Sequence, residues 1–566
     1  MNTISFLISY LNCLVYFYRF RWKLIKFQME NFIIKGPTVP INVEKSLGEY
    51  FWDRAEKYGN RIFQIDAYTG ATETFKDVQR KAVRVAINLK QNGVNPKDVI
   101  MICGENNFDN IIPTLAGLFL GAYVANVVPT TDIYGATNYL SDLKPKVLFV
   151  SDNKLDIFKE ALDVLNLHPQ IYTIGSQKSQ FKSMNEIYNN SIEEKHNFVP
   201  KKVDIHETAF ILLSSGTTSK PKGICISHFT ILGAHTREDK NRSYDLSDQP
   251  FIIFSPLCYI SSIWLLSANI LFTCPRVIGV DIDVELFLKL VDKYKVTGVF
   301  LTYNVAVPLA TLDEKIVSKY DLSSVFYVST GGSFVHPKYI SRLMQIFSKA
   351  FVVPIYGSTE LGTAPFVWKF PSAREVAKTK LNSVGEVNKN CEVKVVDVNT
   401  GKALGPNQKG EILVRSPYRM NGYYNQTDQP FDEDGFLHTG DLGQYDEDRC
   451  FYILDRLKRS FKYLGNFIYP GLVEERLAQH PLVKEAAVIE LPHDADGYRA
   501  MACVVLNQGC IATEKELGDF IVKVMGEYSR PAAGFQFLKE LPVNNNGKVD
   551  FNKLKLMYKT EYGTAT

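Results

Sequence analysis

Residues 213–223 read Leu-Ser-Ser-Gly-Thr-Thr-Ser-Lys-Pro-Lys-Gly and follow an apolar run over residues 209–212. The apolar run predicts a buried strand. The hydroxyl-rich, basic loop after it suits a polyphosphate, because backbone N–H groups and hydroxyls donate to phosphates and a lysine neutralises their charge. It is not the common P-loop, which requires Gly-Lys-Ser/Thr, since Pro221 precedes Lys222 and Gly223 follows it. By composition alone an ordinary turn fits better, so the other motifs have to decide.

The sequence upstream of this loop alternates between helical patterns and short apolar runs. Residues 78–89 carry apolar side chains at helical spacing, and Asn92-Gly93 predicts the end of that helix. Residues 99–102, 122–128 and 147–150 predict strands, and residues 111–120 predict an apolar helix. This alternation predicts an α/β fold in which helices cover parallel sheets.

The pattern changes after about residue 385. Short strands over residues 393–396 and 410–414, with an Asn399-Thr400-Gly401 turn between them, predict a small β-rich subdomain. The charged stretch Asp455–Arg459 predicts a linker. Beyond it, a small α+β domain is predicted from helices over 472–479 and 514–525 and strands over 486–490 and 501–505. We therefore expect an N-terminal domain over 45–454 made of α/β-layered subdomains and the β-rich subdomain, a hinge over 455–458, and a small mobile C-terminal domain over 459–560.

Composition limits the class of protein. The 566 residues are 46% hydrophobic and 22% charged, which predicts a globular protein of several domains. A net charge of +3 without a basic stripe gives no reason to expect nucleic-acid binding. The nine cysteines form no C-x-x-C pair, so free thiols are favoured over zinc or disulfides. We expect an intracellular protein, cytoplasmic or peroxisomal, although its C-terminus lacks Ser-Lys-Leu.

Residues 1–28 form an apolar N-terminal extension. Residues 4–18 are mostly apolar and basic residues follow them, which reverses the order of a signal peptide. The run is shorter than the roughly 20 residues that a membrane span needs. We favour a physiological start at Met29, with membrane contact through residues 4–18 as the alternative.

Four further motifs carry chemistry suited to a nucleotide. The glycine pair in residues 329–333 permits close backbone approach to a flat ligand. Tyr356 can stack on a purine, and the Thr-Glu pair that ends at Glu360 offers a hydroxyl and a hard oxygen for Mg²⁺. Asp441, interpreted as the end of a strand, can accept two hydrogen bonds from a ribose diol. An Asn-Gly turn would project Lys548 rigidly. Taken singly, each also fits a turn, a helix start or a solvated side chain.

Together with the phosphate loop and the charged stretch at 455–465, these motifs resemble, in number and order, the adenylate-forming superfamily. That superfamily includes acyl-CoA synthetases, 4-coumarate:CoA ligases, beetle luciferases and the adenylation domains of peptide synthetases. The resemblance covers about residues 45–555 and is nearest to the luciferase-like and 4-coumarate-like acyl-CoA ligases. It implies an ATP site shared by two domains, with the C-terminal domain swinging about the hinge.

The resemblance also implies a role for individual residues. The implied catalytic residues are Lys222, Thr359, Lys462 and Lys548. The implied nucleotide-binding residues are Ser214, Ser215, Gly216, Thr217, Thr218, Lys222, Gly332, Ser333, Ile355, Tyr356, Gly357, Ser358, Thr359, Asp441, Arg456 and Lys548. The implied substrate pocket is Tyr259, Ser261, Gly331, Gly332 and Thr363. Glu360 is the implied Mg²⁺ ligand, and Lys462 with Gly465 forms the face for the coenzyme A step. His438, in the same motif as Asp441, is assigned a structural role.

The chain departs from the family pattern at several positions. Ser219 replaces a glycine of the phosphate loop, which predicts a slower loop because serine resists positive φ. Tyr259 replaces a histidine at the entry to the acyl pocket. Phe467 and Leu472 replace a glutamine and a carboxylate near the hinge, and asparagines precede Gly547-Lys548.

The implied activity is a two-step ligation. A carboxylic acid attacks ATP to give an acyl-adenylate and pyrophosphate, and coenzyme A then displaces AMP. We expect a medium- or long-chain fatty acid as substrate, with an aromatic acid such as a cinnamate second. The alternatives are a luciferase-type oxidase and a catalytically weak ATP- or acyl-binding protein. We expect only small-molecule partners and a monomer or weak homo-oligomer.

Overall fold

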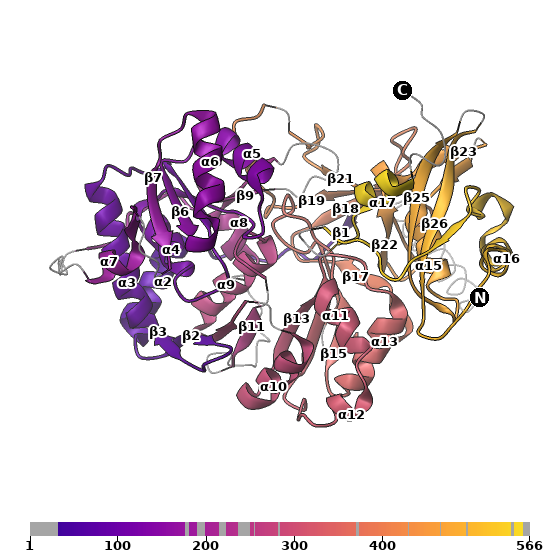
Figure 1. Cartoon of the computed structure of the whole chain (residues 1–566), viewed down its shortest axis with the longest axis horizontal. Coiled ribbons are helices and arrows are strands. Elements are labelled where there is room, and N and C mark those ends of the chain that lie inside the picture. Colours follow the sequence, from indigo (N-terminus) through magenta and orange to yellow (C-terminus); the bar gives the residue numbers. More distant parts are fainter. Residues whose placement is uncertain are drawn as a thin grey trace, which may run out of the picture.

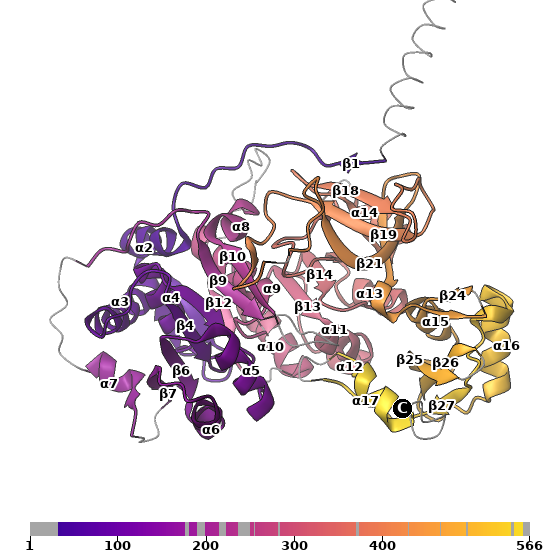
Figure 2. The same ribbon diagram turned by 90° about the horizontal axis from the view of Figure 1, so that it is seen from above.

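The computed structural model describes residues 32–558 apart from 176–179, 190–197, 214–221, 236–248, 254, 281–282, 370–372, 428, 465, 494–495 and 545–547, and apart from the side chains of residues 462, 466 and 467. A large N-terminal α/β domain is joined to a small C-terminal domain, drawn in yellow in Figure 1. Figure 2 shows the two from above, with the C-terminal domain at one end of the molecule. The predicted fold class is confirmed.

The first subdomain is built on an eight-stranded, mostly parallel sheet. In spatial order its strands are β20 (Gly422–Tyr423), β10 (Gly223–Ser227), β9 (Thr208–Leu213), β5 (Tyr123–Asn126), β4 (Val99–Cys103), β6 (Val147–Ser151), β7 (Gln170–Ile174) and β8 (Lys182–Ser183). All five residues of β4 are buried, because helices cover both faces of the sheet. Ile100 and Ile102 face one layer, whereas Met101 and Cys103 face the other.

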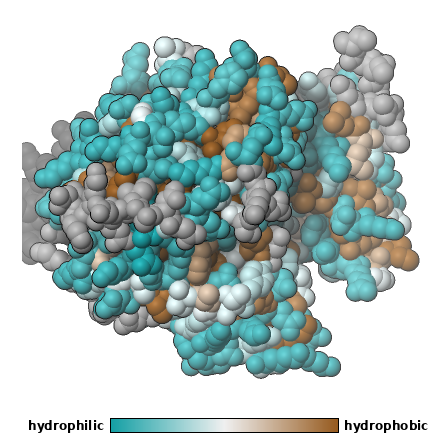
Figure 3. All heavy atoms as spheres, turned by 60° about the vertical axis from the view of Figure 1, so that its left-hand side comes forward, coloured by the Kyte–Doolittle hydropathy of each residue, from teal (hydrophilic) through white to brown (hydrophobic). Residues whose placement is uncertain are grey.

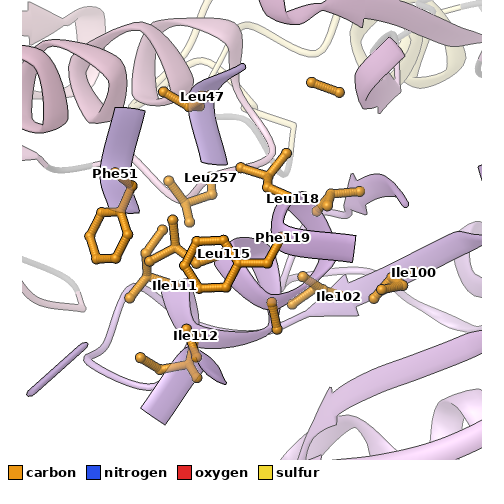
Figure 4. Close-up of a cluster of buried hydrophobic side chains, with 14 of the residues drawn as sticks. Leu47, Phe51, Ile100, Ile102, Ile111, Ile112, Leu115, Leu118, Phe119 and Leu257 are labelled. Carbon is orange, nitrogen blue, oxygen red and sulfur yellow. The ribbon is translucent and has the colours of Figure 1, made fainter. Parts of the chain in front are cut away.

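Two layers of helices enclose this sheet. They are α2 (Leu47–Tyr58), α3 (Phe75–Gln91), α4 (Ile111–Leu120), α5 (Ile133–Leu143), α6 (Leu155–Leu165), α7 (Met184–Asn189), α8 (His228–Gly233) and α9 (Ile260–Phe272). Figure 4 shows the α4 side of the core, where Leu115 and Phe119 pack with Phe51 and Leu257. Thr74 begins α3 with the reciprocal hydrogen bonds of a capping box with Asp77. The predicted helix over 111–120 matches α4, whereas the strand predicted over 122–128 is shorter.

Two smaller sheets form the lower part of the domain in Figure 1. One holds β11 (Phe251–Ile253), β12 (Arg276–Ile278), β2 (Ile62–Asp66) and β3 (Thr72–Thr74). The other is parallel and holds β13 (Gly298–Thr302), β14 (Tyr327–Gly331) and β15 (Phe351–Pro354). The helices of this region are α10 (Val284–Tyr294), α11 (Tyr303–Ala310), α12 (Glu314–Val317) and α13 (Pro337–Ile346). The motif at 329–333 thus straddles the carboxyl end of the central parallel strand, where ligands of α/β proteins commonly bind.

The predicted β-rich subdomain is a seven-stranded sheet. Its order is β1 (Ile34–Lys35), β18 (Glu392–Val396), β19 (Gly410–Arg415), β21 (Leu437–Tyr445), β22 (Phe451–Arg456), β17 (Ser383–Val387) and β16 (Phe366–Val367), with the short α14 (Arg374–Thr379) nearby. The charged stretch predicted as a linker begins inside this sheet. Asp455 and Arg456 are the last residues of β22, and only Leu457–Arg459 leave it, as one turn of 3₁₀ helix.

The C-terminal domain surrounds a five-stranded sheet. Its strands are β24 (Asn466–Ile468), β23 (Phe461–Tyr463), β26 (Gly497–Leu506), β25 (Val483–His493) and β27 (Phe535–Phe537), and its helices are α15 (Pro470–Leu477), α16 (Glu514–Met525) and α17 (Phe551–Tyr558). The helix predicted over 514–525 matches α16. The two strands predicted at 486–490 and 501–505 are longer and form one hairpin, β25–β26.

The outer surface is that of a globular protein. In Figure 3 hydrophilic side chains predominate over the face shown, and apolar side chains gather in smaller groups. Among the helices that the structure describes, none is both long and apolar enough to cross a bilayer. The N-terminal extension, residues 1–28, lies outside the described residues.

Candidate nucleotide and acyl site

The predicted phosphate loop leaves β9 and returns into β10. These strands pair antiparallel, with Gly223 opposite Leu213, so the loop begins and ends at neighbouring points of the sheet. Ser214, Ser215, Gly216, Thr217 and Thr218 lie outside the described residues, as does Ser219. Lys222 is described: its ammonium lies 4.6 Å from the centre of the Tyr423 ring. The aromatic face orients this lysine at the root of the loop.

A second cluster joins three of the predicted nucleotide-binding residues. The Tyr356 hydroxyl donates to one oxygen of the Asp441 carboxylate. The Arg456 guanidinium lies 2.8 Å from the other oxygen. The Asp441 side chain is only 4% exposed, whereas that of Arg456 is 58% exposed. The arginine therefore covers a buried carboxylate from the solvent side.

The strand register explains how Asp441 and Arg456 meet. Asp441 lies within β21 and pairs directly with Arg456 of β22, so their side chains project from the same face. The prediction that Asp441 ends a strand is therefore wrong, because β21 runs on to Tyr445. Before Asp441, Gly440 has a φ of 67° and donates its N–H to Glu411 at 3.0 Å. Sequence reasoning missed Glu411, which belongs to another strand.

Burial and charge shift the protonation of this cluster. Burial raises the pKa of Asp441, and the opposing effects of Arg456 and Tyr356 do not cancel it. Burial and the adjacent carboxylate also raise the pKa of Tyr356 well above its ordinary value. Tyr356 therefore remains a hydroxyl donor at neutral pH. The carboxylate is held by two donors and has remaining acceptor capacity for a ligand.

Lys548, on the C-terminal domain, interacts electrostatically with the same cluster. Its loop is closed by two hydrogen bonds to Asn544: the Asn544 N–H donates to the Lys548 carbonyl at 2.7 Å, and the Lys548 N–H donates to the Asn544 side chain at 3.1 Å. Desolvation and then repulsion from Arg456 lower the pKa of Lys548, while Asp441 raises it. Lys548 is exposed to solvent, and its side chain is within electrostatic range of both Arg456 and Asp441.

The two glycines at the carboxyl end of β14 have different surroundings. A Cβ on Gly331 would come within 3.0–3.1 Å of Ile355 and Phe300, so the close packing of β14 on the next segment requires glycine. Gly332 has a φ of 81°. A Cβ placed on it would meet no atom within 4 Å, so there is open space beside Ser333. A Cβ on Gly357 would meet the Thr363 carbonyl at 3.3 Å. Five predicted site residues thus line adjoining backbone segments: Gly331, Gly332, Ile355, Gly357 and Thr363.

The Ser358-Thr359-Glu360 segment forms a turn beside the two clusters. The Thr359 carbonyl accepts the Gly362 N–H at 3.1 Å, and the Glu360 carbonyl accepts the Met420 N–H at 2.9 Å. Burial raises the pKa of Tyr423 to about 12, and the Glu360 charge contributes. Glu360 also contributes to the raised pKa of Asp441. The charge of Glu360 therefore acts on both Tyr423 and Asp441.

A carboxylate oxygen in this position fits a Mg²⁺ ion that also binds phosphates. Within the described residues, no group of three or more His, Cys, Asp or Glu side chains forms a metal site. An ion at Glu360 would therefore take most of its ligands from phosphate oxygens and water.

Two predicted acyl-pocket residues lie at the start of α9. Tyr259 precedes the first turn of α9, and Ser261 lies within that turn. Burial, with smaller effects of Cys258 and Tyr139, raises the pKa of Tyr259. This tyrosine is therefore a neutral, half-buried side chain near α5. It cannot serve as the titrating base that a histidine here would provide.

The hinge holds a buried ionic network that the motifs did not reveal. The Asp455 side chain is 1% exposed; it accepts the Gly471 N–H at 2.6 Å and lies 3.3 Å from Arg459. Arg459 also pairs with Glu474, whose carboxylate accepts the Val488 N–H at 2.7 Å. Leu472, where the family pattern has a carboxylate, is buried in α15. Gly465 and the side chain of Lys462 lie outside the described residues.

Comparisons with known proteins agree with this geometry. A family model described as "AMP-binding enzyme" matches residues 51–424, and one described as "AMP-binding enzyme C-terminal domain" matches residues 472–548. Luciferin 4-monooxygenase of Photinus pyralis is 30% identical over 541 residues, covering 92% of this chain and 96% of that protein. 4-Coumarate–CoA ligase 2 of Petroselinum crispum is 30% identical, covering 91% and 94%. The structure of the luciferase-like enzyme from the nonluminescent mealworm Zophobas morio has a TM-score of 0.69 and 33% identity, covering 76% of this chain and 100% of that one.

Proposed function

Because this chain belongs to the adenylate-forming AMP-binding enzymes, we propose that it is an ATP-dependent acyl-CoA ligase. The observation that carries the proposal is the buried Tyr356–Asp441–Arg456 cluster, whose charges also act on Lys548 of the C-terminal domain. One domain supplies a carboxylate that suits a ribose diol. The other supplies Lys548, a cation within electrostatic range of that carboxylate.

The chemistry of adenylation explains why a cation is needed near the nucleotide. The acid and the triphosphate are both anions, so a positioned cation stabilises the charge that develops as they react. Lys548 and, at the root of the phosphate loop, Lys222 supply positive charge from two sides. Bound Mg²⁺, held at Glu360, would add its charge at the phosphates. Coenzyme A then takes the acyl group and AMP leaves.

We further propose a medium- or long-chain fatty acid as the first substrate class to test. The first turns of α9 carry apolar side chains next to Tyr259, and the raised pKa of Tyr259 keeps it uncharged. Aromatic acids are the second class to test, because a 4-coumarate–CoA ligase is among the relatives of this chain.

A panel of carboxylic acids tests the proposal. Purified protein is given ATP, Mg²⁺, labelled pyrophosphate and one acid at a time, and acid-dependent exchange of label into ATP is measured. At least one acid should support exchange and, with coenzyme A present, give a thioester detected by mass spectrometry. Absence of exchange with every fatty and aromatic acid would favour a binding protein without catalysis.

A luciferase-type activity is the second candidate, because the relatives include luciferin 4-monooxygenases. Light emission after mixing the protein with luciferin, ATP and oxygen distinguishes the two. We expect acyl-CoA formation without light. Sustained light would replace the ligase proposal.

Lys548→Ala tests the role of the C-terminal lysine. Adenylation should fall by at least about 100-fold, because a charge that acts on the reacting groups is lost. Thioester formation from supplied acyl-adenylate should be largely kept. Lys515→Ala, an exposed lysine of α16 paired with Asp519, is the matched control and should affect neither step. Equal loss of both steps in Lys548→Ala would contradict the assignment.

A further inference from the structure

The C-terminal domain is attached to the N-terminal domain at the start of α13. The Lys338 ammonium donates to three backbone carbonyls of the C-terminal domain: Ala478 at 3.2 Å, Val483 at 3.1 Å and Lys484 at 3.2 Å. An ammonium has three N–H donors, and here a carbonyl lies within reach of each. Figure 2 shows α13 and α15 as neighbours across the domain boundary.

These carbonyls are available for structural reasons. Ala478 caps the C-terminus of α15, where carbonyls lack helical partners and the helix dipole is negative. Lys484 lies at a register shift between β25 and β26, which breaks the ladder there. Its carbonyl also accepts the Tyr339 hydroxyl at 3.0 Å. A cation on the opposing domain fits this group of acceptors.

His336 adds a fifth contact between the domains. Its Nδ1 accepts the Lys338 N–H at 3.2 Å and so caps α13. Its Nε2 lies 3.2 Å from the Glu475 carbonyl in α15. An acceptor at Nδ1 and a carbonyl partner at Nε2 fit a single form, the neutral imidazole protonated on Nε2. His336 and Tyr339 are only 8% and 7% exposed, so this contact is sealed from solvent.

We propose that Lys338, with His336 and Tyr339, is a latch that holds the C-terminal domain in the pose that presents Lys548 to the nucleotide site. The carbonyls that Lys338 holds and Lys548 belong to the same C-terminal domain, and in this pose the charges of Arg456 and Asp441 act on Lys548. The inference rests on the proposed ligase function for its kinetic meaning. The docking itself does not depend on any activity.

The latch acts on the balance between the two half-reactions. Adenylation needs Lys548 beside the nucleotide, so the latched pose favours it. Thioester formation needs the domain to swing, and the Lys338 contacts must then break. Lys338 is thus a positioning residue, since it acts through the pose of Lys548 rather than on the substrate.

Lys338→Met tests the latch, because methionine keeps the length and apolar stem but has no donors. Adenylation should fall about tenfold, the effect of losing charged hydrogen bonds, while thioester formation from supplied acyl-adenylate is unchanged or faster. Tyr339→Phe should show the same split to a smaller extent. Arg342→Met, on the same helix but paired with Glu314 within the N-terminal domain, is the control and should change neither rate.

Hydrogen exchange without substrate separates the latch from the proposed function. In Lys338→Met, amides of residues 474–485 should exchange faster than in the wild type and in Arg342→Met, whether or not any acid is turned over. Unchanged exchange in Lys338→Met, or equal loss of both half-reactions, would overturn the latch. If the wild type is inactive with every acid but hydrogen exchange is faster in Lys338→Met, the latch stands and only the ligase proposal is contradicted.

Discussion

At the scale of single residues, Asp441 depends on Tyr356 for its orientation. Tyr356→Phe removes the hydroxyl donated to a carboxylate that is 4% exposed. Leaving that oxygen without its partner should raise the KM for ATP about tenfold and change kcat less. The measurement is the ATP dependence of pyrophosphate exchange. Tyr445→Phe is the matched control. Tyr445 is the last residue of β21, the strand that holds Asp441, and its hydroxyl donates to the Leu404 carbonyl instead. Equal KM values in the two variants would contradict the role of Tyr356.

The sequence predicted the members of this cluster without predicting how they touch. Tyr356 and Asp441 were assigned to adenine and ribose from separate motifs, yet they are 85 residues apart and hydrogen-bonded to each other. The contact between Asp441 and Arg456 follows from the register of β21 on β22, which is set by the whole sheet. Local sequence patterns indicate the chemistry of a residue, whereas its partner on a neighbouring strand can be identified only once the strand register is known.

At the scale of elements, Arg459 ties α15 to the end of β22. Glu474→Gln removes one of its two counter-charges and should destabilise the C-terminal domain by about 1–3 kcal/mol, less than for a fully buried pair because Arg459 keeps Asp455. Urea unfolding monitored by hydrogen exchange of the domain measures this. Glu527→Gln removes the same charge from an exposed pair and should cost little. A Glu474→Gln domain as stable as the control would show that Asp455 alone holds Arg459.

The capping box of α3 makes a second prediction for an element. Thr74→Ala removes the hydroxyl that accepts the Asp77 N–H and donates to its carboxylate, at a cost of about 1 kcal/mol. That hydroxyl is also the largest cause of the lowered pKa of Asp77. A lowered carboxyl pKa stabilises the fold above the unfolded value of 3.8, and this contribution is lost as pH falls through the folded pKa. The difference in unfolding free energy between wild type and variant should therefore be present at pH 7 and shrink near pH 3.

At the scale of the whole molecule, docking of the two domains should weaken in acid. Burial lowers the pKa of His336 to about 4 from 6.5; the hydrogen bond to Glu475 opposes this, and Lys338 and Arg476 add to it. The docked state therefore keeps the imidazole neutral, while the undocked state binds a proton below pH 6.5. The contribution of His336 to docking is therefore fully present above pH 6.5, and as the pH falls its loss weakens the docking equilibrium by up to about tenfold per pH unit down to about pH 4.

Small-angle scattering against pH measures this change through the radius of gyration. His336→Asn keeps a helix-capping side chain but cannot titrate, so its profile should be flat over the same range. A wild-type profile as flat as that of the variant would mean that His336 does not report on docking.

The family was predictable from six short motifs, and both family models confirm it. The pose of the two domains was not predictable in the same way. Lys338 meets carbonyls about 140 residues further along the chain, and backbone carbonyls leave no mark in a sequence. The hinge also differs from a free linker, because Asp455 is anchored in β22. The motifs therefore indicated candidate site residues, whereas the contacts that position the two domains are visible only in the structure.

Burial of the thiols provides a means of testing whether the C-terminal domain moves. Seven of the eight cysteines in the described part of the chain are buried, and burial raises the pKa of Cys103, Cys274 and Cys503 to about 12. Such thiols react slowly with alkylating dyes. Cys510, the eighth, is partly accessible and lies between β26 and α16 on the C-terminal domain. In a Cys13→Ser variant, which removes the one cysteine outside the described residues, a maleimide fluorophore should thus label the C-terminal domain preferentially, and a change in its emission on substrate addition would report motion of that domain.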